Sequence, residues 1–291
     1  MDVADLSVLV VLLIVGLIVG SFLNVCIYRI PRKKSIVFPG SFCPECNVKI
    51  KWYDNVPVLS YVLLGGRCRR CKVRIPIRYL LVELLTGYVF VHLCYVFICC
   101  RHESPCVLLS YIVLCCALIV SAFIDLKLLV IPDEVTFVCI PLALVLSVIC
   151  PSLHNAEDTL RSFTLVGIHR LDTLIASIIG VFVGGGMIFI CSILGKLALR
   201  KDAMGFGDAK LMCMVGGFVG WKLAVAIFFV APFFGLLMAI PVLVFKKSKL
   251  IPYGPFLSFA TLICIFMQDY FIGLINLYVQ FFTVIFTGFH S

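Results

Sequence analysis

Charged side chains are scarce in this sequence. Asp, Glu, Lys and Arg together make up 13% of the 291 residues, whereas 63% are hydrophobic. Soluble domains contain about a quarter charged residues, and the mean hydropathy of +1.16 lies outside their range. The shortage of charge therefore excludes an ordinary soluble domain and indicates a protein that crosses a membrane several times.

Motifs of several common enzyme classes are also absent. The sequence contains no Gly-rich dinucleotide fingerprint, P-loop, His-Glu-x-x-His or Gly-x-Ser-x-Gly motif. Its five histidines are scattered, so no set of Ser, His or metal ligands competes for a hydrolytic role. The run Gly184–Gly186 lies within an apolar span, where small residues favour close helix packing over phosphate binding.

The positive charge is concentrated in one loop. Residues 29–78 contain 12 Lys or Arg against Glu45 and Asp54, which accounts for the whole net charge of +9. Membrane topology and anionic lipid headgroups explain such a loop. We therefore expect anionic lipid as a partner of the loop, and no nucleic acid.

Apolar stretches recur along the chain, and a helix needs about 20 such residues to span a bilayer. They cover Leu6–Ile27, Tyr79–Cys100, Pro105–Ile124, Val135–Cys150, Thr173–Leu194, Leu211–Gly220 joined to Leu223–Phe245, and Phe256–Phe286. The last is long enough for a hairpin that turns near Gln268–Tyr270. We predict an all-α polytopic membrane protein with about seven to nine transmembrane helices.

The flanks of the first span predict its orientation. Asp2 and Asp5 precede it and basic residues follow it, which is the reverse of a cleavable secretory signal. Because basic loops stay on the cytoplasmic side, the N-terminus is expected outside and residues 29–78 in the cytoplasm. Alternating the spans then places 20 of the 24 Lys and Arg residues in cytoplasmic connections.

Four of the sixteen cysteines have the spacing of a metal site. Cys43 and Cys46 form one C-x-x-C pair, and Cys68 and Cys71 form another. Four thiolates complete a tetrahedron around Zn²⁺, and a reducing compartment keeps thiols free. We predict a structural zinc in a small cytoplasmic loop domain between the first two spans, with redox disulfides or unbound thiols as the alternatives.

Two aspartates lie at the cytoplasmic ends of their helices in this topology. Asp125 ends a helix that runs inward, and Asp208 begins one that runs outward, so both face the same side. An acid at a membrane boundary is a functional candidate, although Asp208 has the alternative of capping its helix. On topology alone, three other acids compete for the site: Asp133, Glu134 and Asp202.

A carboxylate pair suits hydrolysis of a peptide bond. Two carboxyls in a small site do not ionise together easily, so one stays protonated. The ionised one can take a proton from water, and the protonated one can donate to the scissile carbonyl. Gly205 and Gly207 flank Asp208 without side chains, which would let an extended substrate backbone approach.

The sequence resembles the type IV prepilin peptidases, which are bacterial inner-membrane aspartyl proteases of the Gly-x-Gly-Asp type. The resemblance covers most of the chain and includes both cysteine pairs. The other matching segments are Gly20–Val25, Tyr28–Pro31, Trp52–Tyr61, Arg78–Tyr79, Glu83, Ile124–Leu126, Ile131–Asp133, Gly205–Lys210 and Pro252–Phe256.

The resemblance implies that Asp125 and Asp208 are the catalytic pair and that precursors of type IV pilins or pseudopilins are the substrates. It also implies N-methylation of the new N-terminus with S-adenosylmethionine, for which Glu83 and Gly87 are candidate binding residues. The implied division is a first helix at 1–28, a methyltransferase-associated domain at 29–78 and a peptidase domain at 79–291. A peptidase without methyltransferase activity, or a transporter with interfacial acids, stays as an alternative. The oligomeric state is not predicted.

Overall fold

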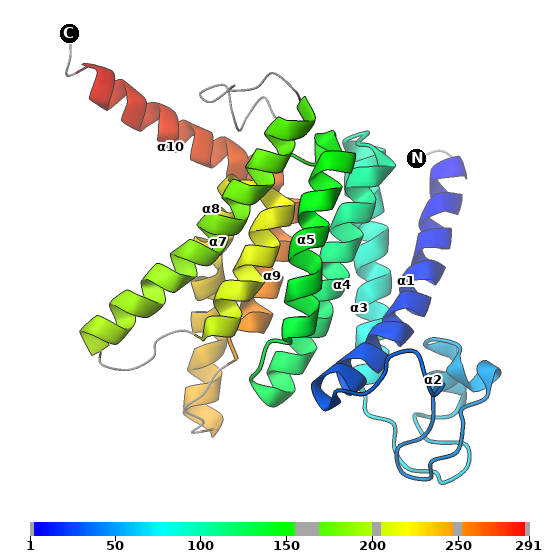
Figure 1. The fold of residues 1–291 in the computed structure, drawn as a ribbon. Coiled ribbons are helices and arrows are strands. Elements are labelled where there is room, and N and C mark those ends of the chain that lie inside the picture. The colour runs from blue at the N-terminus through cyan, green and yellow to red at the C-terminus, as the bar shows by residue number, and fades with distance from the viewer. Residues whose placement is uncertain (1–2, 155–168, 200–204, 247–251, 289–291) are drawn as a thin grey trace. The chain divides into compact units, whose positions relative to one another are not determined.

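The computed structural model of the chain describes residues 3–154, 169–199, 205–246 and 252–288 (Figure 1). Their regular structure is helical, and β pairing in these ranges is limited to two isolated bridges, Phe42 with Lys49 and Arg67 with Arg74. The predicted all-α fold is therefore confirmed. The chain divides into two compact units, Met1–Ile124 and Asp125–Ser291. The division predicted at residues 28 and 78 concerns activity rather than packing and stays a prediction.

Unit 1 is built on two helices that pack side by side. They are α1 (Val3–Arg29) and α3 (Arg78–Cys94), and a π-helical turn at Tyr95–Cys100 and most of α4 (Pro105–Leu128) follow them. A Cβ atom on Gly16 would lie 2.9 Å from the Cα of Gly87, and one on Gly20 would lie 2.8 Å from the Cα of Glu83. The four-residue spacing of the two α1 glycines thus allows the helix backbones to approach closely.

The segment between α1 and α3 contains only short helical turns, at Ile30–Arg32, Trp52–Asn55 and α2 (Leu59–Leu63). Arg29 fixes its beginning, because the buried guanidinium donates hydrogen bonds to the carbonyls of Ser35, Pro39 and Gly40. Asn24 joins the two ends of the segment by donating to the Tyr79 carbonyl at 3.0 Å. These bonds hold a segment that has little apolar core of its own.

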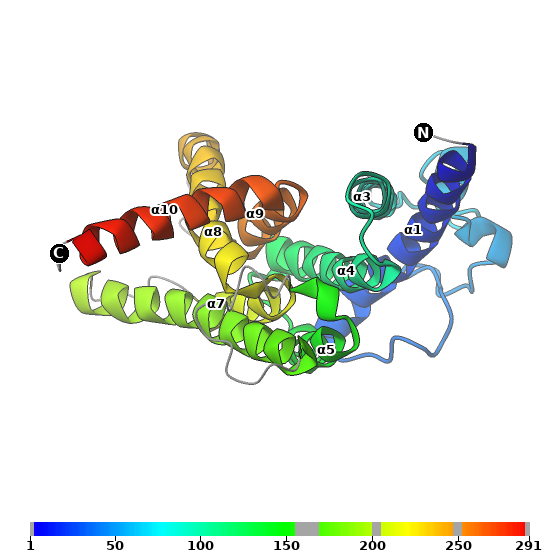
Figure 2. The same ribbon diagram turned by 90° about the horizontal axis from the view of Figure 1, so that it is seen from above.

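Unit 2 contains five longer helices, and α5, α7 and α8 pack against one another (Figure 2). The five are α5 (Asp133–Ile149), α7 (His169–Leu199), α8 (Phe206–Lys246), α9 (Gly254–Phe266) and α10 (Gln268–Gly288). Where α7 meets α8, Gly180 and Gly216 bring the two backbones into direct contact. Gly184 packs against the Met212 backbone and Gly185 against the Cys213 sulfur, which confirms close packing for two of the three glycines in that run; nothing lies within 4 Å of a Cβ on Gly186.

In the part of the chain that the structure describes, candidate spans are fewer than the seven to nine predicted. Among the described residues, five helices are long and apolar enough to cross a membrane, or six if a bent pair is counted as one span. One reason is that α5 has only 17 residues. Another is that α8 counts as one candidate span, although the non-helical Gly220 (φ 77°, ψ 171°) divides it into two helices across a kink, between the predicted stretches Leu211–Gly220 and Leu223–Phe245. Finally, α9 and α10 meet at 88° instead of folding back as a hairpin.

Candidate active site and cysteine cluster

Asp125 lies in the last turn of α4, and its side chain is buried. The backbone N–H of Gly254, 129 residues further along the chain, donates to Asp125 Oδ2 at 3.0 Å. A Cβ atom on residue 254 would lie 2.7 Å from the same oxygen. Because only glycine lets the backbone come so close, the first residue of α9 is shaped to hold this carboxylate.

Asp208 lies in the first turn of α8 and is also buried. Its Oδ2 accepts a hydrogen bond at 3.2 Å from the N–H of Gly205, the residue directly before the helix. A side chain in the first turn that reaches back to the amide before the helix is half of a capping box. The capping role considered from the sequence is therefore present, and it positions the carboxylate for a further role.

The two neighbouring glycines have different surroundings. Gly205 is exposed, whereas a Cβ atom on Gly207 would lie 3.2 Å from the Cβ of Ile131. Gly207 therefore has a packing role in the structure. The approach of a substrate backbone at these two residues stays a prediction.

The fold of unit 2 brings the two aspartates to one site. Their carboxyl groups are close enough to interact electrostatically, although 82 residues separate them in the sequence. The competing acids differ: Asp133 is exposed and forms an ion pair with Lys210 at 2.7 Å, and Glu134 is exposed. Asp202 lies outside the described residues. Burying a carboxylate costs free energy, so two buried ones within electrostatic range of each other indicate a functional site.

Sequence reasoning did not single out Tyr253, which directly precedes Gly254. Its hydroxyl is buried without a hydrogen-bond partner. Burial, together with the negative charge of Asp208, raises the pKa of Tyr253 to about 12. In the sequence, Tyr253 is marked only by its position in the family segment Pro252–Phe256. Membership of a matching segment does not by itself indicate what a residue does.

The four cysteines form a cluster that could bind a metal. Their sulfur atoms all lie within 4.8 Å of one another, and Cys43 Sγ lies 3.8 Å from Cys71 Sγ. A tetrahedron with metal–sulfur bonds of about 2.3 Å has sulfur atoms about 3.8 Å apart. One sulfur pair has the separation of a tetrathiolate zinc site, and the other pairs exceed it by at most about 1 Å.

The two cysteine pairs have the same local structure. In each, the first cysteine accepts a hydrogen bond from the residue four positions on, at 2.9 Å from Asn47 N to Cys43 O and 3.0 Å from Lys72 N to Cys68 O. Asn47 and Lys72 both have positive φ angles, and each loop is closed by one of the isolated bridges. Two tight loops of this kind place four thiols toward a common centre.

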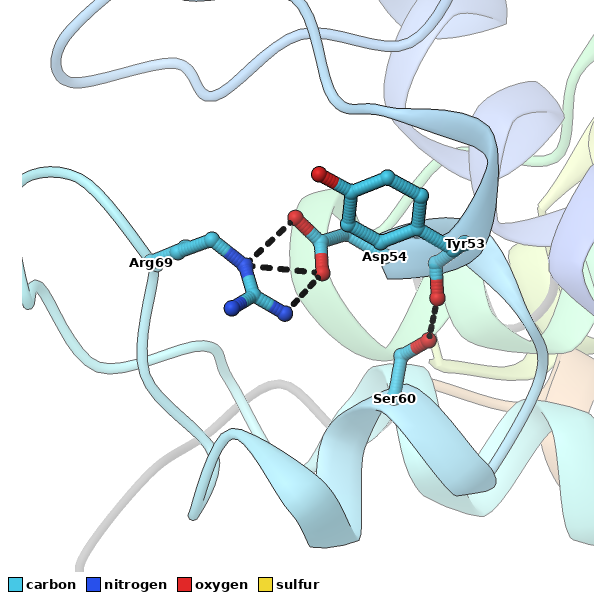
Figure 3. A network of polar contacts seen from close by, with 4 residues as sticks. All are labelled: Tyr53, Asp54, Ser60 and Arg69. Carbon is cyan, nitrogen blue, oxygen red and sulfur yellow. Dashed lines mark hydrogen bonds and ion pairs between the residues drawn. The ribbon is translucent and has the colours of Figure 1, made fainter.

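An ion pair connects the second cysteine loop to the segment that precedes α2. Figure 3 shows Arg69, which lies between Cys68 and Cys71, donating to the carboxylate of Asp54 at 2.6 Å; Ser60 donates to the Tyr53 carbonyl in the same region at 3.0 Å. The hydrogen bonds and charge of Arg69 lower the pKa of the Asp54 carboxyl. The position of the cysteine cluster is thereby coupled to residues 53–60.

Those residues in turn contact Glu83, one of the two candidate cofactor residues. Glu83 is buried on α3, accepts the N–H of Val58 at 2.7 Å and is hydrogen-bonded to Ser21. Next to Ser21 lies a cavity of about 580 Å³, lined by the α1 face between Ile14 and Val25 and by Ser41, Trp52 and Asn55–Pro57. Gly87, the other candidate, packs against the Leu17 side chain and serves the helix contact.

Comparison with known proteins gives the family. Residues 14–97 match the bacterial peptidase A24 N-terminal domain, and residues 112–240 match the type IV leader peptidase family. The prepilin leader peptidase/N-methyltransferase of Neisseria gonorrhoeae is 30% identical over 269 residues, which cover 84% of this chain and 85% of that protein. The chain belongs to the type IV prepilin leader peptidase family. It is thus a multi-pass inner-membrane enzyme.

Two further relatives support the assignment. The type 4 prepilin-like proteins leader peptide-processing enzyme of Escherichia coli O78:H11 is 32% identical, over 88% of this chain and 93% of that protein. The prepilin leader peptidase/N-methyltransferase of Myxococcus xanthus is 34% identical, and the match spans 79% of this chain but only 62% of that longer protein. No solved structure gives a significant match.

Proposed function

We propose that this prepilin peptidase cleaves the leader of type IV prepilins or pseudopilins with Asp125 and Asp208 as its catalytic pair. The family supplies the activity, since its relatives are named prepilin leader peptidases and N-methyltransferases. The observation that carries the residue assignment is the meeting of two buried carboxyls from α4 and α8 at one site. Family membership also argues against the transporter alternative.

The proposed reaction is general acid–base hydrolysis. The ionised carboxyl removes a proton from a water molecule, and the oxygen of that water attacks the scissile carbonyl carbon. The other, protonated carboxyl donates a hydrogen bond to the carbonyl oxygen. When the tetrahedral intermediate collapses, the C–N bond breaks and the leaving amine takes the proton of the acidic partner. The Gly254 and Gly205 amides support this scheme, because each holds one oxygen of its carboxyl and leaves the other for water or substrate.

The assay that tests the function uses purified protein, a purified prepilin and added S-adenosylmethionine as the methyl donor. Mass spectrometry of the product reports the cleaved bond from the loss of the leader, and methylation from a gain of one methyl group. Cleavage without any gain would favour the peptidase-only alternative.

We further propose that S-adenosylmethionine, which supplies the methyl group when bound, occupies the cavity next to Ser21. Three features of the cavity fit this cofactor. Its volume is within the range of about 300–1,000 Å³ typical of small-molecule sites, Trp52 offers a surface for stacking the adenine, and Ser21 links the lining to the carboxylate of Glu83. The negative charge of Glu83, which lies behind Ser21 and outside the lining itself, suits a ligand that carries a sulfonium cation.

A binding measurement checks this placement independently of activity. Replacing Trp52 by Ala should weaken binding of radiolabelled S-adenosylmethionine about tenfold, because stacking on a base contributes roughly 1–3 kcal/mol. Phe38→Ala is the matched control, since Phe38 is an equally exposed aromatic of the same segment that does not line the cavity. Equal affinity in the wild type and Trp52→Ala would remove this site.

For the cysteine cluster we propose a structural zinc held by Cys43, Cys46, Cys68 and Cys71. The matching loops and the sulfur separations support a closed tetrathiolate site. Four protein ligands leave no open position for substrate. The proposed role is therefore to fold residues 29–78, and no step of the hydrolysis involves the metal.

We also propose the orientation predicted from charge, with the N-terminus outside, residues 29–78 in the cytoplasm and anionic lipid next to that basic segment. The support is the distribution of Lys and Arg. A membrane-impermeant thiol reagent applied to spheroplasts should label the exposed Cys100 at once. A cysteine introduced by Lys34→Cys should react only after permeabilisation. The opposite order would reverse the topology.

A further inference from the structure

The hydroxyl of Tyr253 lacks a partner in an otherwise well-bonded site. Both aspartates accept backbone hydrogen bonds, from Gly254 and Gly205, whereas the Tyr253 oxygen is buried and makes no hydrogen bond. Buried polar groups in native proteins are nearly always paired, and exceptions call for an explanation. One explanation is that the partner of the Tyr253 hydroxyl is a hydrogen-bond acceptor on the bound substrate.

The position of Tyr253 relates it to both carboxyls. Its neighbour Gly254 holds Asp125 through the backbone, while its own side chain lies in the field of Asp208. The residue precedes the first turn of α9 with φ −89° and ψ −29°, an unstrained conformation. One dipeptide at the start of α9 thus contacts one catalytic candidate and interacts electrostatically with the other.

The chemistry of the phenol defines what it can bind. Burial and the charge of Asp208 raise its pKa to about 12, so the hydroxyl stays protonated at neutral pH and remains a donor. During hydrolysis, negative charge develops on the oxygen of the scissile carbonyl as water adds to its carbon. A donor already in place inside a water-poor site stabilises such an oxygen strongly, because it needs no reorganisation.

We propose that Tyr253 is a third active-site residue, whose hydroxyl donates a hydrogen bond to the carbonyl oxygen of the scissile peptide. The bond is made without proton transfer: the leaving amine still receives its proton from the acidic aspartate, and Tyr253 keeps its own. This inference rests on the proposed function of Asp125 and Asp208. It adds a second hydrogen-bond donor to the carbonyl oxygen, beside the protonated aspartate.

The test is Tyr253→Phe, which removes one oxygen atom and keeps the ring. Loss of one oxyanion donor lowers kcat by about 10²–10³-fold in a well-studied protease. We therefore expect kcat for prepilin cleavage to fall about 10²-fold, with KM changed by less than about threefold, because the bond strengthens in the transition state. Tyr270→Phe is the matched control, since Tyr270 is an exposed tyrosine of the same unit, and should keep full activity.

Three further readouts separate this role from a structural one. The melting temperature and the methylation of a pre-cleaved pilin should equal those of the wild type. The pH dependence of kcat should keep its midpoints, because Tyr253 is proposed to contact the substrate and not to tune Asp208. An unchanged kcat, a loss confined to KM, a shifted pH profile or a lowered melting temperature would each overturn the proposal. Cleavage retained in Asp125→Asn and Asp208→Asn would instead overturn the proposed function.

Discussion

Replacing Asp125 or Asp208 by Asn is expected to abolish leader cleavage, lowering kcat/KM by at least about 10³-fold. A general acid or base typically increases the rate 10²–10⁴-fold. When two residues act as a unit, removing either one removes most of the rate enhancement of both. Asn has the shape of Asp, and its carbonyl oxygen can still accept the N–H of Gly254 or Gly205. The fold should therefore persist while the proton chemistry is lost.

The double variant gives a second, sharper expectation. If the two carboxyls act together in one catalytic step, the double variant Asp125→Asn/Asp208→Asn should be no less active than either single variant. Multiplying losses would mean that the residues act independently. The product is measured by mass spectrometry, and methylation of a pre-cleaved pilin shows that each variant is still folded.

Two nearby acids serve as matched controls. Asp133→Asn and Glu134→Gln remove the same kind of charge from exposed positions at the start of α5. Both should retain cleavage within about threefold of wild type, because exposed charges contribute little through solvent. Inactivity of either control, or activity of an Asp125 or Asp208 variant, would contradict the assignment.

Replacing one of the four clustered cysteines by Ser is expected to have the second large effect. Elemental analysis should give about one zinc per wild-type chain and much less in Cys43→Ser or Cys68→Ser. Metal binding contributes on the order of 10 kcal/mol to the folding of small zinc domains. Residues 29–78 contain few regular elements, so we expect this segment to become open to proteolysis.

Cys100→Ser is the control, because Cys100 lies outside the cluster, at the opposite end of the α3 span. It should leave both the zinc content and the protease resistance unchanged. A protein that contains no zinc, or a Cys43→Ser variant that keeps its full content, would contradict the structural role. Methyl transfer should fall with the zinc, since the Arg69–Asp54 ion pair and the Val58–Glu83 bond join the cysteine loop to the proposed cofactor cavity.

Much of the fold follows from local patterns in the sequence. The apolar stretches become helices because their length and composition suffice, and the C-x-x-C pairs form matching loops because their geometry depends on a few adjacent residues. The meeting of Asp125 and Asp208 could be anticipated from topology, which places both helix ends at one membrane face.

Features that depend on distant contacts could not be predicted in this way. The hydrogen bond from Gly254 to Asp125 joins residues 129 positions apart, and no local pattern encodes it. The direction in which the chain continues after a break also depends on such contacts: Gly220 divides α8 into two helices across a kink, whereas α9 and α10 meet at 88°. Tyr253 was missed because the sequence does not show whether a hydroxyl is buried and has a hydrogen-bond partner.

The glycine contact between α7 and α8 fixes the depth of Asp208 relative to α7. Gly216 lies eight residues after Asp208, a distance of about 12 Å along the helix, and its backbone rests directly against that of Gly180. With no flexible side chain between them, α8 has little freedom to slide, so Asp208 is held at a constant height. Asp208 therefore stays at a fixed depth in the membrane. For the proposed prepilin substrate, the depth of its apolar helix in the bilayer then determines which peptide bond reaches Asp208.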